Sequence, residues 1–248
     1  MAALNLSFDD SDVGFSKGDA GDKEQLLVRS ATVAEAEVKI RLGFLRKVFG
    51  ILSAQLVLTT IIAGAFVLSP GIGHHVRNNS WTVVVGLVLS LVLLLAMMVK
   101  RREAPTNYIL LAAWTVVEAY TIGVVVSFYD KVIVLEAFLL TTFVVAALFL
   151  YTLQTKRDFT GYAPALFAFL WVIIIAGFMQ MFIQSPLMEF GLAVGGALLF
   201  SVYIVVDLQM MMYHLSAEEY ILATLNIYLD IINLFLHILR ILQATQRN

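Results

Sequence analysis

Long apolar segments alternate with short polar connections along most of this chain. From about residue 48 onward, runs of about 20 mostly apolar residues recur, and each is long enough to span a bilayer as a helix. Lipid offers no hydrogen bonds to the backbone, and these runs are too long for barrel strands, so helices are predicted. The pattern predicts an all-α integral membrane protein with seven transmembrane helices, at about 48–69, 82–99, 107–128, 132–154, 163–184, 187–212 and 218–242.

Residues that start and stop helices fall at the edges of these segments. Proline can begin or end a helix there without losing an interior hydrogen bond. Ser216 and Glu219 have the spacing of a capping box, which predicts the start of the last helix. The four prolines are Pro70, Pro105, Pro164 and Pro186.

The N-terminal part of the chain has a different composition. Residues 1–35 are polar and acidic with few aromatic side chains, which predicts a disordered acidic cytosolic tail. Residues 36–248 are predicted to form one seven-helix transmembrane domain. No signal peptide is visible, because the first apolar run comes too late and is too long.

Basic residues concentrate on one side of the predicted membrane topology. They flank the first segment and fill the second and fourth connections, at 100–102 and 156–157. The positive-inside rule therefore places the N-terminus in the cytosol. Seven spans would place the C-terminus on the other side, whereas a re-entrant last segment would return it to the cytosol.

Composition excludes several classes of site. The chain is 60% hydrophobic and 14% charged, whereas soluble domains average about 25% charged residues. It has no cysteine, which excludes disulfides and thiolate metal sites.

Acidic side chains within the apolar segments are the main chemical signal. Apart from Arg240 near the end of the last segment, these segments contain no lysine or arginine. A charge at the centre of a membrane helix costs about 2.5–3.5 kcal/mol, so such groups normally face water, a partner or the bundle interior. Carboxylates without a neighbouring cation suit protons or hard metal cations. Beyond the capping-box turn at the start of the last segment, the acids are Glu118, Glu136, Glu189, Asp207 and Asp230.

Asp207 and Asp230 are predicted to lie on neighbouring antiparallel helices, since a short connection joins their segments. Counted from that connection, Asp230 lies about 7–12 Å deeper than Asp207, so direct contact requires helix tilt or a different helix boundary. If the two carboxyl groups meet, they cannot both ionise cheaply and would share a proton, which makes a pH sensor. Alternatively, each is separately solvated in a cytosolic vestibule.

The last segment carries a polar stripe. Asn226, Asp230, Asn233, His237 and Arg240 are spaced three and four residues apart, which places them on one helical face. The stripe is either a hydrogen-bonded seam between helices or the lining of a cation path.

On the cation-path interpretation, further residues take roles along it. Glu118, Asn226, Asn233 and His237 are candidate pore-lining residues, and Glu136 and Glu189 would lie at the luminal mouth. No dense ligand cluster is present, so no tight metal site is expected. Transient Ca²⁺ binding is expected at Asp207 and Asp230.

Four motifs resemble one membrane protein family. The sequence IYLDIINLFLHILR at 227–240 resembles the terminal motif of the transmembrane Bax inhibitor motif family, and FSVYIVVD at 200–207 resembles its sixth-helix motif. RLGFLRKV at 41–48 and LYTLQTKRD at 150–158 are similar to the Lifeguard branch. The resemblance extends over about 38–245.

The resemblance implies a seven-helix fold in which the other six helices wrap the last. It also implies a pH-sensitive Ca²⁺ leak from Golgi or endoplasmic reticulum stores and protection from apoptosis. Asp207 and Asp230 match the paired pH-sensing aspartates of the family. A basic residue after the second helix latches one of them in a bacterial relative, and Lys100 or Arg101 is the candidate here. The expected partners are the lipid bilayer, Ca²⁺, protons, and other membrane channels or apoptosis regulators, with no cofactor and no nucleic acid.

Three other function classes compete with the leak. Two intramembrane aspartates suggest an aspartyl protease, but those enzymes have Gly-x-Gly-Asp where this chain has Tyr228-Leu229-Asp230. We therefore expect no enzyme activity. A seven-helix receptor conflicts with a cytosolic N-terminus. A scaffold that regulates other channels or death proteins without conducting stays an alternative.

Overall fold

The computed structural model describes the backbone of residues 18–69, 71 and 81–246, and the side chains within these ranges from residue 39 onward. In this part of the chain, every regular element is helical. The helices are α1 (Gly18–Leu68), α3 (Trp81–Lys100), α4 (Thr106–Val126), α5 (Lys131–Gln154), the short 3-10 helix η1 (Thr160–Tyr162), α6 (Ala163–Ile183), α7 (Pro186–Gln209), the π-helix η2 (Met210–His214) and α8 (Tyr220–Gln246).

Seven of the described helical stretches are long and apolar enough to cross a membrane, which confirms the predicted fold class. Their bounds lie within four residues of the predicted segments except at the first, where the apolar stretch begins at Lys39 rather than at residue 48. Prolines begin two helices as predicted, with Pro186 at the first position of α7 and Pro164 in the first turn of α6. Pro70 lies outside the described residues.

The predicted N-terminal tail overlaps the first helix. Residues 18–35 have a helical backbone as the beginning of α1, whereas residues 1–17 lie outside the described residues. The boundary between a disordered tail and the transmembrane domain therefore stays a prediction.

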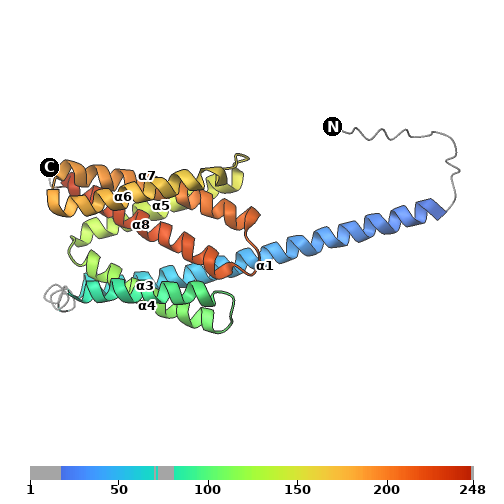
Figure 1. Cartoon of the computed structure of the whole chain (residues 1–248), viewed down its shortest axis with the longest axis horizontal. Coiled ribbons are helices and arrows are strands. Elements are labelled where there is room, and N and C mark those ends of the chain that lie inside the picture. Colours follow the sequence, from blue (N-terminus) through green and yellow to red (C-terminus); the bar gives the residue numbers. More distant parts are fainter. Residues whose placement is uncertain (1–17, 70, 72–80, 247–248) are drawn as a thin grey trace, which may run out of the picture. The chain divides into compact units, whose positions relative to one another are not determined.

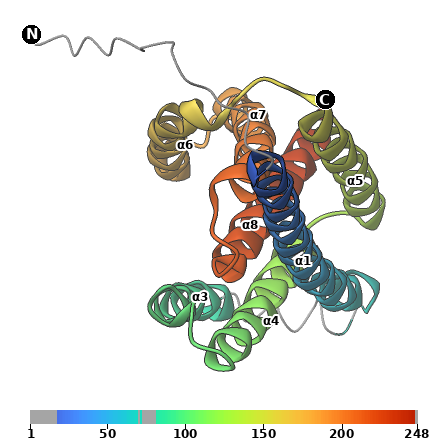
Figure 2. The same ribbon diagram turned by 90° about the vertical axis from the view of Figure 1, so that its right-hand side faces the viewer.

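Among residues 44–248, helix α8 lies between two groups of helices. Figures 1 and 2 show α5, α6 and α7 on one side of it, and α3 and α4 on the other. It has the largest buried share of the seven spans. None of the residues of α6, by contrast, is buried. That all six other helices wrap α8 stays a prediction.

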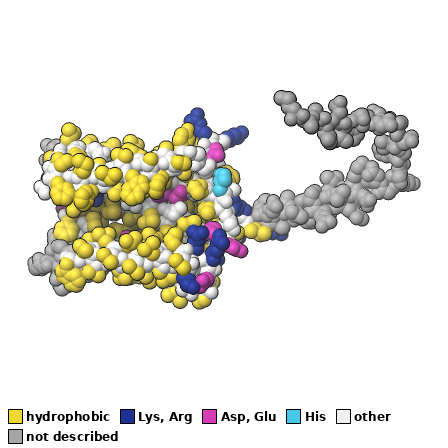
Figure 3. Space-filling model, in the orientation of Figure 1, with side chains coloured by type: hydrophobic (Ala, Val, Ile, Leu, Met, Phe, Trp, Pro, Cys, Tyr) yellow, Lys and Arg dark blue, Asp and Glu magenta, His cyan; other side chains and the backbone are white. Residues whose placement is uncertain are grey.

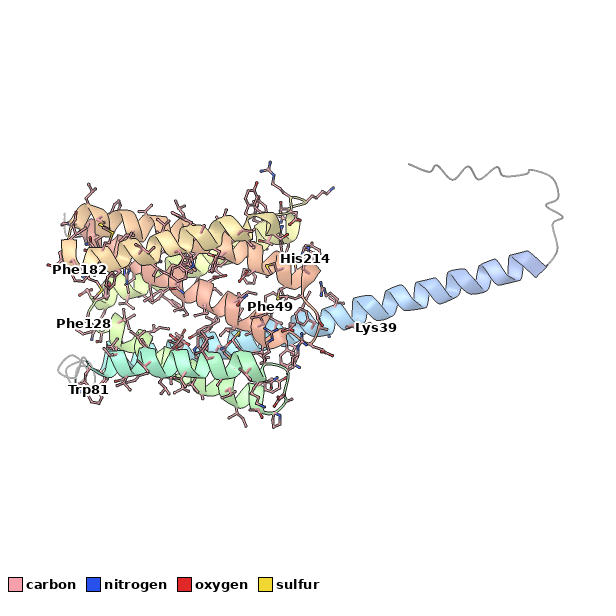
Figure 4. All side chains as sticks on the ribbon, viewed as in Figure 1. Lys39, Phe49, Trp81, Phe128, Phe182 and His214 are labelled. Carbon is pink, nitrogen blue, oxygen red and sulfur yellow. The ribbon has the colours of Figure 1, made fainter. Side chains whose placement is uncertain are left out.

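The outer surface of this bundle is apolar and its charges gather at one end. Figure 3 shows yellow side chains along the helices, and lysine and arginine at the end where α3 meets α4 and α5 meets α6. Figure 4 places His214 at this same end, and Trp81, Phe128 and Phe182 at the other. An apolar belt with a basic rim at one end is the arrangement expected in a bilayer.

Candidate functional site

The carboxyl groups of Asp207 on α7 and Asp230 on α8 meet between these helices. Each carboxyl group interacts directly with the other, and the Asn226 side chain also hydrogen-bonds to Asp207. The Tyr203 hydroxyl interacts electrostatically with both acids. Asp230 is only 6% exposed, and its Oδ2 atom is buried without a hydrogen-bond partner. From the sequence, contact between these two carboxyl groups required helix tilt or a different helix boundary. The structure contains that contact.

Helix boundaries explain why the two acids meet. Asp207 lies seven residues before the end of η2 at His214, and Asp230 lies ten residues after α8 begins at Tyr220. The depth difference is therefore three residues, about 4.5 Å, rather than the 7–12 Å predicted. The predicted boundaries were wrong here because the end of α7 continues as a π-helix to His214, so the connection to α8 comes two residues later in the chain than predicted.

Hydrogen bonds made by the Gln209 side chain tie the end of α7 to the α5–α6 connection. Gln209 accepts a hydrogen bond from the Phe159 backbone N–H at 2.7 Å and donates to the Arg157 carbonyl oxygen at 2.8 Å. Its side chain is buried. Single π-turns inside α-helices are frequent at functional sites. This clamp ties the α5–α6 connection to α7 two residues beyond Asp207.

The chemistry of the pair follows from its surroundings. Two carboxyl groups in contact cannot both carry a charge at low cost, so they titrate as a unit that shares a proton. An unpartnered carboxyl oxygen also offers a ligand to a hard cation. Among the described residues, however, no group of three or more His, Asp or Glu side chains could hold a metal ion.

The rest of the predicted polar stripe has two different environments. Asn233 donates to the Leu229 carbonyl of its own helix at 2.8 Å. His237 is buried and stacks on Phe200 of α7, with ring centroids 5.6 Å apart. Arg240 is exposed and interacts electrostatically with His237. Towards the C-terminal end of the stripe, therefore, His237 packs against α7, whereas Arg240 is exposed.

Gly196 of α7 makes the His237 position possible. A Cβ atom at residue 196 would lie 2.2–2.5 Å from three atoms of the imidazole ring, closer than real Cβ contacts. Sequence analysis missed this residue, because one glycine among 15 carries little signal. The same imidazole has a buried Nδ1 atom without a hydrogen-bond partner.

Glu118 lies apart from the aspartate pair, in the group formed by α3 and α4. It is half-buried in the middle of α4 and accepts a hydrogen bond from the Ser90 hydroxyl of α3. Trp114 donates from Nε1 to the same Ser90 oxygen at 3.0 Å. The structure thus gives Glu118 its own polar surroundings.

Glu136 and Glu189, the acids predicted at the luminal mouth, are exposed near the starts of α5 and α7. Gln246 at the end of α8 donates to Glu136 at 3.3 Å. Glu189 lies in the first turn of α7, where the helix dipole stabilises a carboxylate. Both lie at the end of the bundle away from the basic connections.

Lys100 and Arg101, the candidate latch residues, form ion pairs with acids other than Asp207 and Asp230. Lys100 pairs with Glu103 at 2.8 Å on the surface, whereas Arg101 pairs with Glu219 at 3.2 Å. Arg102 also hydrogen-bonds to Glu219, which raises the pKa of the Arg102 guanidinium above its ordinary value. The structure therefore pairs Lys100 and Arg101 with Glu103 and Glu219, and a latch from either residue to the aspartate pair stays a prediction.

Glu219 is a residue whose role the sequence did not indicate. It was predicted to close a capping box with Ser216, but α8 begins only at Tyr220 and the buried Glu219 side chain turns to the two arginines. The next residue, Tyr220, accepts a hydrogen bond from Asn107 at 2.8 Å and lies under the Lys47 ammonium, 3.2 Å from the ring centroid. These contacts join α1, α4 and the α3–α4 connection to the start of α8.

Comparison with known proteins agrees with this architecture. Residues 41–248 match the family described as Inhibitor of apoptosis-promoting Bax1. The chain is 42% identical to Protein lifeguard 4 of Mus musculus over 238 residues, which cover 96% of this chain and 99% of the relative. It is 40% identical to the Golgi anti-apoptotic protein of Vaccinia virus (strain Lister), over 88% of this chain and 92% of the relative. Bax inhibitor 1 of Schizosaccharomyces pombe is 38% identical, over 87% and 82% of the two chains.

The names Golgi anti-apoptotic protein and Bax inhibitor 1 describe inhibitors of apoptosis or of Bax, and neither describes an enzyme. With seven apolar helices and a family match over most of its length, this chain is a membrane protein that belongs to the Bax inhibitor family and resembles its Lifeguard members.

Proposed function

We propose that this protein is a pH-sensitive Ca²⁺ leak channel of intracellular membranes that lowers store Ca²⁺ and so protects cells from apoptosis. The observation that carries the proposal is the contact between the Asp207 and Asp230 carboxyl groups on α7 and α8. Such a pair has two protonation states that differ in charge within one small volume. It can therefore change both its cation affinity and the helix contact when the pH changes.

Three steps lead from the pair to gating. With one shared proton, the carboxyl groups attract each other and hold α7 against α8. When that proton leaves, two like charges face each other in low dielectric and repel strongly. The charges are relieved by separation of the helices, by water, or by a cation that binds between the oxygens. Ca²⁺ is a suitable cation because it prefers carboxylate oxygens, and the Asn226 amide donates a hydrogen bond to Asp207 beside the pair.

On either side of the aspartate pair, the proposed cation path continues along polar or acidic residues toward both ends of the bundle. Asn226 and the π-helical end of α7 lie toward the basic end of the bundle, and Glu136 and Glu189 lie at the other end. Exposed carboxylates at that mouth would concentrate divalent cations. The absence of a dense acidic cluster in the described residues suits transient binding, which a conducting path requires.

Orientation and location are part of the proposal. Basic connections at one end support a cytosolic position for that end and for the N-terminus. The relative named Golgi anti-apoptotic protein supports a Golgi location, and the endoplasmic reticulum is the alternative. Other membrane channels or apoptosis regulators are proposed partners.

The proposal is tested by Ca²⁺ flux into liposomes that contain the purified protein, with the external pH varied between about 5 and 8. We expect protein-dependent flux with a pH response that is lost in the Asp207→Asn/Asp230→Asn double variant. Glu218→Gln is the matched control, since it removes one exposed acid from the connection between α7 and α8 that has no role in the proposed path. Flux no greater than in empty liposomes, with helical content intact, would reject the leak in favour of a scaffold.

A further inference from the structure

We propose that Glu118 is a second proton-binding site, separate from the aspartate pair and coupled to α8 through Trp114 and Tyr228. The site is built from α1, α3, α4 and α8, and its ligand is a single proton taken up by the Glu118 carboxylate. The inference does not depend on Ca²⁺ conduction.

A directed chain of hydrogen bonds leads to the Glu118 carboxyl group. Trp114 Nε1 can only donate, and it donates to Ser90 Oγ at 3.0 Å. With that lone pair occupied, Ser90 directs its own proton to Glu118 Oε1. Trp114 is buried at 1% exposure and Ser90 at 8%. The indole therefore senses the charge on Glu118 through one hydroxyl.

Within the part of the chain that the structure describes, the groups around Glu118 supply no cation to compensate its charge. From α3, the carboxyl group is faced by the neutral Ser90 hydroxyl, and from its own helix by Trp114 through that hydroxyl. The titratable group that faces it from α8 is Tyr228, which is electrostatically coupled to Glu118. From α1, Thr59 reaches this group through its 2.8 Å hydrogen bond to the Tyr228 hydroxyl. At membrane depth, a carboxyl group whose neighbours are hydroxyl groups is more stable protonated than charged.

The path from Glu118 to α8 is a packed aromatic contact. The Trp114 ring meets the Tyr228 ring edge to face, with centroids 5.4 Å apart and planes at 71°. Tyr228 is fully buried, so this contact cannot shift without moving its neighbours. A change in the charge on Glu118 therefore acts on a rigid part of α8.

Helical periodicity separates this site from the aspartate pair. Tyr228 and Asp230 are two residues apart, which is about 200° around a helix. One side of α8 thus faces the Trp114–Ser90–Glu118 chain, and the opposite side faces Asp207. Two carboxyl sites act on one helix from opposite sides, through different neighbours.

The test follows Trp114 fluorescence. Trp81 and Trp171 are 65% and 52% exposed on the outer surface, so Trp81→Phe/Trp171→Phe leaves Trp114 as the only tryptophan at little cost in packing. In nanodiscs, we expect one sigmoidal shift of its emission between about pH 4 and 9, below the usual range of tyrosine. Glu118→Gln should abolish the shift, and Asp207→Asn/Asp230→Asn should leave it in place.

Three results would overturn the site. These are an emission that does not change with pH, a shift that survives Glu118→Gln, and a shift that disappears in the aspartate double variant. If the single-tryptophan protein does not fold, infrared difference spectra of the chain with all its tryptophans serve instead. Glu118→Gln should remove one protonated-carboxyl band that the aspartate double variant keeps, and equal spectra for Glu118→Gln and the parent protein would refute the proposal.

Discussion

The contact between Gly196 and His237 predicts a large effect from a single methyl group. In Gly196→Ala, the new Cβ would lie 2.2 Å from the nearest imidazole atom, where van der Waals contact needs at least 3.4 Å. The ring is stacked on Phe200 and buried, so it cannot swing into solvent. Overpacking of this kind costs about 1–3 kcal/mol. Alanine's better helix propensity offsets about 0.5–1 kcal/mol of that cost.

The measurement is the free energy of unfolding in detergent micelles or nanodiscs, with Gly191→Ala as the matched control. Gly191 lies on the same helix, and a Cβ there would have no heavy atom within 4 Å. The control should be neutral or slightly stabilising. Gly196→Ala should be destabilising in the parent chain and neutral or stabilising in a His237→Ala background, where the ring is absent.

The difference between the two backgrounds isolates the clash from the cost of losing the histidine. An equal effect of Gly196→Ala in both backgrounds would refute the packing of His237 against α7. So would a stability of Gly196→Ala as high as that of the Gly191→Ala control.

Three further changes test other contacts. Tyr228→Phe removes a buried hydrogen bond to α1 and should cost about 0.5–1.5 kcal/mol, whereas Tyr213→Phe on the surface should cost nothing measurable in the same unfolding assay. Glu219→Gln removes the ion pairs that join α8 to the α3–α4 connection and should lower the midpoint of thermal unfolding more than Glu103→Gln, whose ion pair is exposed. Hydrogen bonds from Thr160 lower the pKa of Asp158, so its stabilising contribution is present above about pH 4 and is lost as the pH falls through the lowered value. Asp158→Ala should therefore flatten the acid side of the plot of stability against pH, and an unchanged slope would contradict that assignment.

Much of the architecture was predictable because a bilayer restricts the possible structures. Length and hydropathy are enough to place spans in lipid, so the helices α3 to α8 begin and end near their predicted positions. Three- and four-residue spacing was also enough to place Asn226, Asp230 and His237 on one side of α8, where all three contact α7.

Contacts that depend on backbone detail at the helix ends were less predictable. The depth of Asp207 relative to Asp230 was overestimated because a π-helix has no clear sequence pattern. The latch was assigned to Lys100 and Arg101 by resemblance, but the conformation of a short connection decides which acid an arginine reaches. Here that acid is Glu219, which the spacing from Ser216 had marked as a helix cap.

The central claim is that Asp207 and Asp230 sense pH as one unit. The most direct measurement is Ca²⁺ flux against pH for the parent chain, Asp207→Asn, Asp230→Asn and the double variant in the same liposomes. If the two carboxyl groups share one proton, either single substitution should abolish the pH response as completely as the double variant does. Two single variants that each keep part of the response, with effects that add in the double variant, would contradict the account.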